Sequence, residues 1–226
     1  MSPPAQLLES RLRLPCSVQF PDADFQKTNS LGDICRVARG LLMVAFRLRL
    51  ALQALAAGGI VACPAEAVWG LSCDPWNVAA VDSLLVMKQR PMHKGLILVA
   101  ADLAQVAPFL QTLRPSLQRK VILSWPGPNT WLLPHRRLLP ETVTGEHATV
   151  AVRVTAHPGL SALCRAWGGA LVSTSANKAG SQAPRDLFQV RRYFSVGLDA
   201  VLPGAVDRAA RPSVIRDVYS DRVLRS

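Results

Sequence analysis

The sequence contains few residues of the kinds that cross-link a small domain or bind a metal ion. Its 226 residues include five cysteines and four histidines, with no CxxC pair and no close grouping of either type. Disulfide frameworks and zinc sites need such groupings, so both are disfavoured and no metal ligands are expected. The cysteines predicted to be reduced and mostly buried are Cys16, Cys35, Cys63, Cys73 and Cys164.

Long apolar runs are also missing. The most hydrophobic region, residues 41–59, is interrupted by Arg47 and Arg49 and does not provide the roughly 20 uninterrupted apolar residues of a membrane span. The first residues do not resemble a secretory signal, whose apolar core would lie close to Met1. A membrane location is therefore disfavoured, and a cytoplasmic one is expected.

The common nucleotide-binding and hydrolase motifs are absent. The sequence has no GxxxxGK[ST] phosphate loop, no GxGxxG fingerprint and no GxSxG nucleophile elbow. A nucleotide site in this chain must be built from other residues, and the best candidates are polar side chains where strands end.

Negative charge is scarce. The chain has 26 Lys and Arg against 15 Asp and Glu, a net charge of +11. Residues 1–42 hold five of these cations and four of the anions, so the excess belongs to residues 43–226. A basic body of this kind attracts nucleic acid, nucleotides or anionic membranes, and charge alone does not choose among them.

Patterning predicts an extension followed by one α/β domain. Residues 1–42 lack sustained periodicity, which indicates a poorly ordered extension or a start codon placed too far upstream. Helical spacing begins at Val44 and stops at Gly58. Further helices are predicted at 78–88, 102–110, 115–124 and 157–169, and strands at 60–64, 96–100, 131–134, 149–154 and 170–174. This alternation predicts a single layered α/β domain over residues 43–226.

Three cations lie close together in KQRPMHKG, residues 88–95. A solvated surface loop would explain them, since charge runs are usually solvated. The alternative is an anion clamp, in which Lys88 and Lys94 act as point charges and Arg90 grips phosphate oxygens with two hydrogen bonds. The segment alone leaves both possibilities open.

Other candidates lie where strands are predicted to end. VSTSAN, residues 172–177, offers three hydroxyls and an amide, which are typical of turns and caps but also suit phosphate oxygens. Thr130 and Arg153 lie near predicted strands, and Arg153 needs an anionic partner if it is buried. CPAEAVWGLSCD, residues 63–74, suggests a tight loop near a ligand, although a turn between strands explains it nearly as well.

Six segments in order resemble the YrdC-like family of threonylcarbamoyl-AMP synthases, in its short, single-domain bacterial branch. They are PAEAVWGLSCD, KQRPMHKGLILVA, WPGPNT, AVRVTAHP, STSAN and PSVIRD. The resemblance extends from about Met43 to the C-terminus. It implies an α/β fold with a twisted mixed β-sheet flanked by helices and a concave basic cleft.

The resemblance implies a nucleotidyltransferase that converts L-threonine, bicarbonate or carbon dioxide, and ATP into L-threonylcarbamoyl-adenylate and pyrophosphate. Mg²⁺ is the expected cofactor and enters with ATP. Partner proteins would then transfer the threonylcarbamoyl group to the adenosine beside the anticodon of tRNA. Since the reacting groups are anionic, positioning and charge neutralisation should dominate catalysis, without a covalent enzyme nucleophile.

The family's motifs carry over to named positions. The KxR pair, Lys88 and Arg90, is expected to be catalytic. The expected ATP-binding residues are Lys88, Arg90, Lys94, Thr130, Ser173, Ser175 and Asn177, and the expected threonine or intermediate pocket comprises Ala65, Arg153, Ser213 and Arg216. Ala65 stands where the family usually has threonine, and Ser72 where glycine is common, which puts contacts in that loop in question but leaves the KxR and SxN groups intact.

Two other functions compete with this one. A noncatalytic module that binds RNA, including double-stranded RNA, would use the same basic cleft, but no RNA-binding signature is visible. A sugar-phosphate enzyme of the same general fold would need acidic metal ligands, and few carboxylates lie near the motifs. The resemblance favours the synthase over both.

Overall fold

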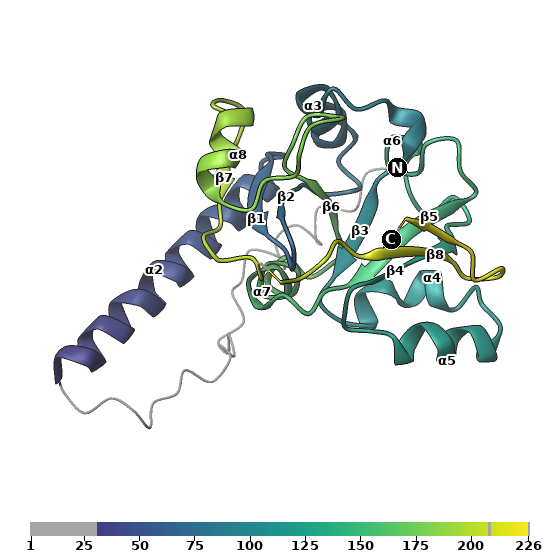
Figure 1. Cartoon of the computed structure of the whole chain (residues 1–226), viewed down its shortest axis with the longest axis horizontal. Coiled ribbons are helices and arrows are strands. Elements are labelled where there is room, and N and C mark those ends of the chain that lie inside the picture. Colours follow the sequence, from purple (N-terminus) through teal and green to yellow (C-terminus); the bar gives the residue numbers. More distant parts are fainter. Residues whose placement is uncertain (1–30, 208, 226) are drawn as a thin grey trace.

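The chain forms one mixed sheet with helices on both faces (Figure 1). This computed structural model describes residues 31–207 and 209–225, and for residues 31–39 and 41 the backbone alone. The strands in this range are β1 (Val61–Pro64), β2 (Trp69–Ser72), β3 (Ile97–Ala100), β4 (Asn129–Pro134), β5 (Thr149–Val154), β6 (Leu171–Ser175), β7 (Ala200–Val201), β8 (Val214–Asp217) and β9 (Val223–Arg225). The α-helices are α2 (Leu31–Ala56), α3 (Val78–Lys88), α4 (Ala107–Leu110), α5 (Pro115–Leu123), α6 (Glu141–Thr144), α7 (Pro158–Trp167) and α8 (Leu187–Tyr193), with 3₁₀ turns η2 (Met92–Lys94) and η3 (Ala104–Val106).

The strand order within the described residues is β7-β1-β2-β6-β3-β5-β4-β8-β9. β1 with β7, β3 with β5 and β4 with β8 pair in parallel, and the other neighbours are antiparallel. The predicted mixed sheet flanked by helices is confirmed. On one side of β6, Ser173 pairs with Ile97 of β3. On its other side Ser175 pairs with Gly70 of β2, so three motif segments meet in the middle of the sheet.

Each face of the sheet packs on its own apolar cluster. Leu98 belongs to the cluster that includes residues of α3, α4 and α5, whereas its neighbour Val99 belongs to the one formed with α2 and α7. Successive side chains of a strand point to opposite faces, so β3 contributes to both clusters. Burial of a side chain such as that of Leu98 stabilises the fold by about 2 kcal/mol.

Local sequence signals set the ends of α3 as predicted. The side chain of Asn77 caps the helix, because its Oδ1 accepts a hydrogen bond from the backbone N–H of Ala80 at 3.1 Å. The helix ends at Lys88, and the next residue, Gln89, has φ 52°. This left-handed residue turns the chain sharply, so Lys88 and Arg90 lie on either side of the helix end.

The first predicted helix is longer than its pattern suggested. It spans Leu31–Ala56, so the predicted boundary after residue 42 falls inside a continuous helix. Figure 1 shows the N-terminal half of α2 projecting away from the sheet, and the side chains of Leu42 and Phe46 are exposed. Residues 42–47 are all exposed, and a helix segment without a buried face needs no apolar periodicity, so the pattern did not mark where the helix begins. The prediction for residues 1–30 lies outside the described residues.

Two findings concern the absences noted in the sequence. Cys63, Cys73 and Cys164 are free and buried, as predicted, and burial is the main cause that raises the pKa of Cys63 to about 11. The side chains of Cys16 and Cys35 lie outside the described part of the chain. Among the described helices, none combines the length and the hydrophobicity needed to cross a membrane.

Gly145 is expected not to tolerate a side chain. It has φ 61° and ψ −145°, and a Cβ would lie 2.5 Å from the carbonyl oxygen of His93 in η2. Gly145→Ala should therefore lower the free energy of unfolding by about 1–3 kcal/mol, measured by urea denaturation. Gly168, with φ 79° and open space around its Cβ position, is the control. An equal loss in Gly168→Ala would contradict the predicted clash.

Candidate active site

A cavity of about 200 Å³ lies where β2, β3 and β6 meet. The loop between β1 and β2 lines it through residues 65–68, and the segment before β8 lines it through residues 211–213. β1 and β2 form an antiparallel hairpin, so the turn between strands is confirmed for residues 63–74, and it forms a wall of the cavity. The charged residues of the described lining are Glu66, Arg90, Arg153, Arg211 and Arg225.

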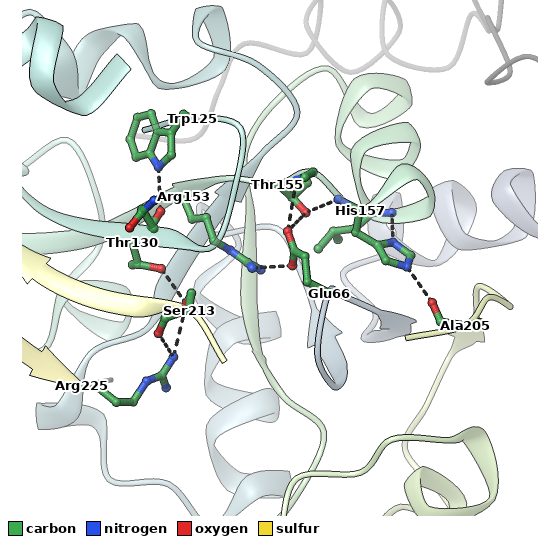
Figure 2. A network of polar contacts seen from close by, with 12 residues as sticks. Glu66, Trp125, Thr130, Arg153, Thr155, His157, Ala205, Ser213 and Arg225 are labelled. Carbon is green, nitrogen blue, oxygen red and sulfur yellow. Dashed lines mark hydrogen bonds and ion pairs between the residues drawn. The ribbon is translucent and has the colours of Figure 1, made fainter. Parts of the chain in front are cut away.

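A buried ion pair crosses this site. Nη1 of Arg153, at the end of β5, donates a hydrogen bond to Oε2 of Glu66 at 2.5 Å (Figure 2). Oε1 of Glu66 accepts from Oγ1 of Thr155 at 2.7 Å and from the backbone N–H of Ala156 at 3.1 Å. Arg153 is only 7% exposed, so Glu66 is the anionic partner that a buried arginine requires.

Glu66 is held in its ionised form. Burial favours the neutral carboxyl, but the charge of Arg153 and the hydrogen bonds from Thr155 and Ala156 outweigh it, and the pKa of Glu66 lies below its ordinary value. Thr155 also accepts from the backbone N–H of His157, whose ring Nε2 lies 3.0 Å from the carbonyl oxygen of Ala205 (Figure 2). With its oxygens occupied, Glu66 is a structural anion rather than a free base.

The C-terminal strands bring a second set of polar groups to the cavity. Oγ1 of Thr130 donates to Oγ of Ser213 at 2.9 Å, and Nη2 of Arg225 donates to the carbonyl oxygen of Ser213 at 3.2 Å (Figure 2). Thr130 is fully buried and is not part of the lining, so it acts on the site through Ser213. Arg225 comes from β9, at the end of the described chain.

Positive charge is in excess in this cavity. Nε and Nη2 of Arg90 donate to the carbonyl oxygen of Gly95 at 3.3 and 2.9 Å. Burial, and then the charge of Arg225, lowers the pKa of Arg90, while burial, and then Arg153, lowers the pKa of Arg225. These guanidinium groups therefore repel one another, and Glu66 is the single carboxylate in the described lining. An anion would relieve this repulsion, so the cavity is suited to bind one.

Hydroxyl groups complete the set of donors. Ser173 and Ser175 line the cavity from β6, where residues two apart in a strand point to the same face. Neutral hydroxyls and fork-shaped guanidinium groups are both good partners for phosphate and carboxylate oxygens. The arrangement can therefore orient a ligand with several anionic oxygens.

Lys88 and Asn177 are buried and are not part of the lining. The Nζ of Lys88 donates to the carbonyl oxygens of Ser175 and, at 2.7 Å, of Asn177. Lys88 is 3% exposed, and burial, followed by the charge of Arg90, lowers its pKa to about 8. The buried ammonium is thus bonded to the backbone that carries the serines.

The predicted site residues fall into two groups. Those that line the cavity are Ala65, Arg90, Arg153, Ser173, Ser175 and Ser213. Those outside the lining are Lys88, Lys94, Thr130, Asn177 and Arg216. Lys94 is exposed in η2, and Nη1 of Arg216 lies 3.8 Å from Oδ1 of Asp221.

The sequence did not identify Glu66, Arg211 and Arg225 as site residues. The isolated glutamate of residues 63–74 was a signal for Glu66, but its partner Arg153 is 87 residues away. No local pattern marks Arg225, because only the pairing of β9 with β8 brings it to the cavity.

A dedicated Mg²⁺ site does not fit the lining. No group of three or more His, Cys, Asp or Glu side chains that could hold a metal ion occurs among the described residues. Glu66 is the single carboxylate of the described lining, and its oxygens already accept from Arg153, Thr155 and Ala156. Mg²⁺ prefers such oxygens as protein ligands, so these residues alone would not hold it.

Sequence comparisons identify relatives of this chain. The Sua5/YciO/YrdC family model, described as "Telomere recombination", matches residues 53–226. A threonylcarbamoyl-AMP synthase of Saccharophagus degradans is 49% identical over 180 residues, which cover 80% of this chain and 94% of that protein. One from Pseudomonas aeruginosa is 48% identical over 184 residues, which cover 81% and 99%.

Solved structures share the fold. P. abyssi Sua5 complexed with L-threonine has a TM-score of 0.74 and 28% sequence identity, over 79% of this chain and 53% of the P. abyssi chain. E. coli YciO has a TM-score of 0.69 over 79% of this chain and 87% of its own. At 21% identity the second similarity concerns the fold alone.

Glu66→Gln should expose the role of the ion pair in stability. The variant keeps the shape of the side chain but leaves Arg153 without a countercharge, so the free energy of unfolding at neutral pH should fall by about 2 kcal/mol. The pKa of Glu66 is lower in the folded state than its ordinary 4.5. The stabilisation is therefore complete above pH 4.5 and is lost as the pH falls through the folded-state pKa.

Urea denaturation over this pH range measures both effects. In Glu66→Gln, the pH dependence that belongs to this carboxyl should be missing. Glu146→Gln, at an exposed position, is the control and should change stability by less than about 0.5 kcal/mol. Equal stability of Glu66→Gln and the wild type at every pH would contradict the structural role of Glu66.

Proposed function

As the chain belongs to the Sua5/YciO/YrdC family, we propose that it is a threonylcarbamoyl-AMP synthase. The observation that carries this proposal is the arginine-rich cavity between β2, β3 and β6, in a chain about half identical to such synthases over nearly their whole length. The complex of P. abyssi Sua5 with L-threonine supports that amino acid as one substrate. The adenylate in the relatives' name supports ATP as another.

The proposed reaction begins with the formation of a carbamate. The neutral amine of L-threonine adds to carbon dioxide and releases a proton, or condenses with bicarbonate and releases water. A carbamate oxygen then attacks the α-phosphorus of ATP and forms the new oxygen–phosphorus bond. The bond from the α-phosphorus to the oxygen bridging the β-phosphate breaks, and pyrophosphate leaves with that electron pair. Such phosphoryl chemistry needs mainly alignment and charge stabilisation.

The lining supplies both requirements. Arg90 and Arg225 bring fixed positive charge next to the reacting anions, and Ser175 offers a hydroxyl donor from β6. Arg153 is already oriented by Glu66, so its guanidinium group is placed before a ligand arrives. Donors held in advance need little reorganisation during the reaction, which makes them effective in catalysis.

The proposal also covers Mg²⁺, the fate of the adenylate and the location of the protein. Mg²⁺ is proposed to enter bound to the phosphates of ATP, because the described lining has no carboxylate free to hold it. The adenylate is proposed to pass to proteins that modify the adenosine beside the anticodon of tRNA. This role would place the protein in the cytoplasm, where tRNA is used.

Pyrophosphate release tests the proposal. The purified chain should release pyrophosphate when ATP, L-threonine and bicarbonate are all present, and omission of L-threonine should abolish the release. Arg90→Met should lower kcat/KM by about 10²- to 10³-fold, since it removes a charged donor from the cavity. Arg222→Met is the control, because Arg222 is exposed near the β8–β9 turn and does not line the cavity.

Two results would count against the proposal. Release of pyrophosphate without L-threonine would indicate a different ATP-consuming enzyme. No release under any condition, together with salt-dependent binding of double-stranded RNA, would favour the noncatalytic module instead.

A further inference from the structure

Lys88 connects the end of α3 to the end of β6 in both directions. Its Nζ donates to the carbonyl oxygens of Ser175 and Asn177, the latter at 2.7 Å. In return, the carbonyl oxygen of Lys88 accepts from the backbone N–H of Ala179 at 2.9 Å. The side chain is 3% exposed, so these bonds are shielded from water.

The side chain of Asn177 is committed to the same turn. Its Nδ2 donates to the carbonyl oxygen of Lys178 at 2.9 Å and to that of Ser181 at 2.6 Å. Because an amide nitrogen has two hydrogens, both are occupied. The remaining atom, Oδ1, is an acceptor and has no donor to offer a phosphate oxygen.

The sequence neighbours of Lys88 and Asn177 lie at the cavity. Ser173, Ser175 and Arg90 line the cavity, whereas Lys88 and Asn177 do not. The side chains of Lys88 and Asn177 therefore bind backbone carbonyls, while their neighbours in the sequence line the cavity. A mobile turn after β6 would spread the Ser175 hydroxyl over several positions, and loss of alignment is costly in catalysis.

We infer that Lys88 and Asn177 are positioning residues, which fix residues 175–181 so that Ser175 is held toward the anionic ligand. The identity of the ligand in this inference rests on the proposed function. The hydrogen bonds of Lys88 and Asn177 do not depend on it. It differs from the phosphate contacts expected for both residues from the family motifs. Direct contacts with the ligand are left to Arg90, Arg153, Arg225 and the two serines.

The test compares variants that differ in hydrogen-bonding capacity. Lys88→Met removes the donors, Lys88→Gln keeps a neutral donor on a shorter side chain, and Asn177→Ala removes the amide. Lys178→Met is the matched control, since Lys178 lies in the same turn and contributes only its backbone carbonyl to these bonds. Circular dichroism defines conditions in which each variant is folded, and Asn177→Ala serves alone if Lys88→Met does not fold.

Amide hydrogen exchange and calorimetry give independent readouts. Exchange of the amides of residues 176–181 should rise at least ~10-fold in Lys88→Met and Asn177→Ala, and less in Lys88→Gln. Affinities for ATP and for L-threonine, titrated separately, should fall by similar factors. The double variant should be little weaker than either single variant, because both changes release the same turn. Lys88→Gln should restore part of kcat relative to Lys88→Met.

Opposite results would overturn the inference. A loss of ATP affinity in Lys88→Met with unchanged amide exchange and unchanged threonine affinity would mean that the ammonium contacts phosphate directly. Additive effects of Lys88→Met and Asn177→Ala would mean that the residues act separately. If the wild type binds neither ligand, the proposed function fails, while the exchange rates still decide whether Lys88 and Asn177 hold the turn.

Discussion

The ion pair between Glu66 and Arg153 joins parts of the sheet that backbone pairing cannot join. Glu66 follows β1 and Arg153 lies on β5, and three strands separate β1 from β5 in the sheet. A buried ion pair contributes little net stability compared with apolar contacts, but losing one partner is costly. Its effect is therefore to specify one arrangement of the 65–68 loop against β5. The cavity exists in this shape because that loop forms one of its walls.

The cationic side chains of the site differ in the partners that they already have within the protein. Arg153 is neutralised by Glu66, and the ammonium of Lys88 is bonded to backbone carbonyls. Arg90 bonds to the carbonyl oxygen of Gly95, and Arg225 bonds to the carbonyl and hydroxyl oxygens of Ser213; burial, and then the charge of a neighbouring arginine, lowers the pKa of each. The buried ammonium of Lys88 therefore holds the backbone, whereas the guanidinium groups that line the cavity can still bind a ligand. Lys88 and Arg90, two cations of one sequence motif, thus have different uses.

The sequence predicted the parts of the structure that have local causes. The ends of α3, predicted at residues 78 and 88, follow from residues within one helical turn. β3 and β6 follow from their short apolar runs. By contrast, no strand was predicted at β2 or β9, which lack such a run and pair with neighbouring strands that are distant or irregular in the sequence pattern. The same distinction applies to the site, where the motifs marked Arg90 and Ser175, but Glu66 and Arg225 required contacts between distant segments.

The alanine at position 65 leaves the backbone contact of its loop intact. Ala65 lines the cavity beside Glu66, and its backbone N–H bonds to the carbonyl oxygen of Val68 at 3.0 Å, a contact that any residue except proline can make. The family's usual threonine would add one neutral hydroxyl there. Hydrogen bonds from charged donors are about twice as strong as neutral ones. The guanidinium groups come from β5, β9 and the segment after α3, so we expect them to bind an anion without this hydroxyl.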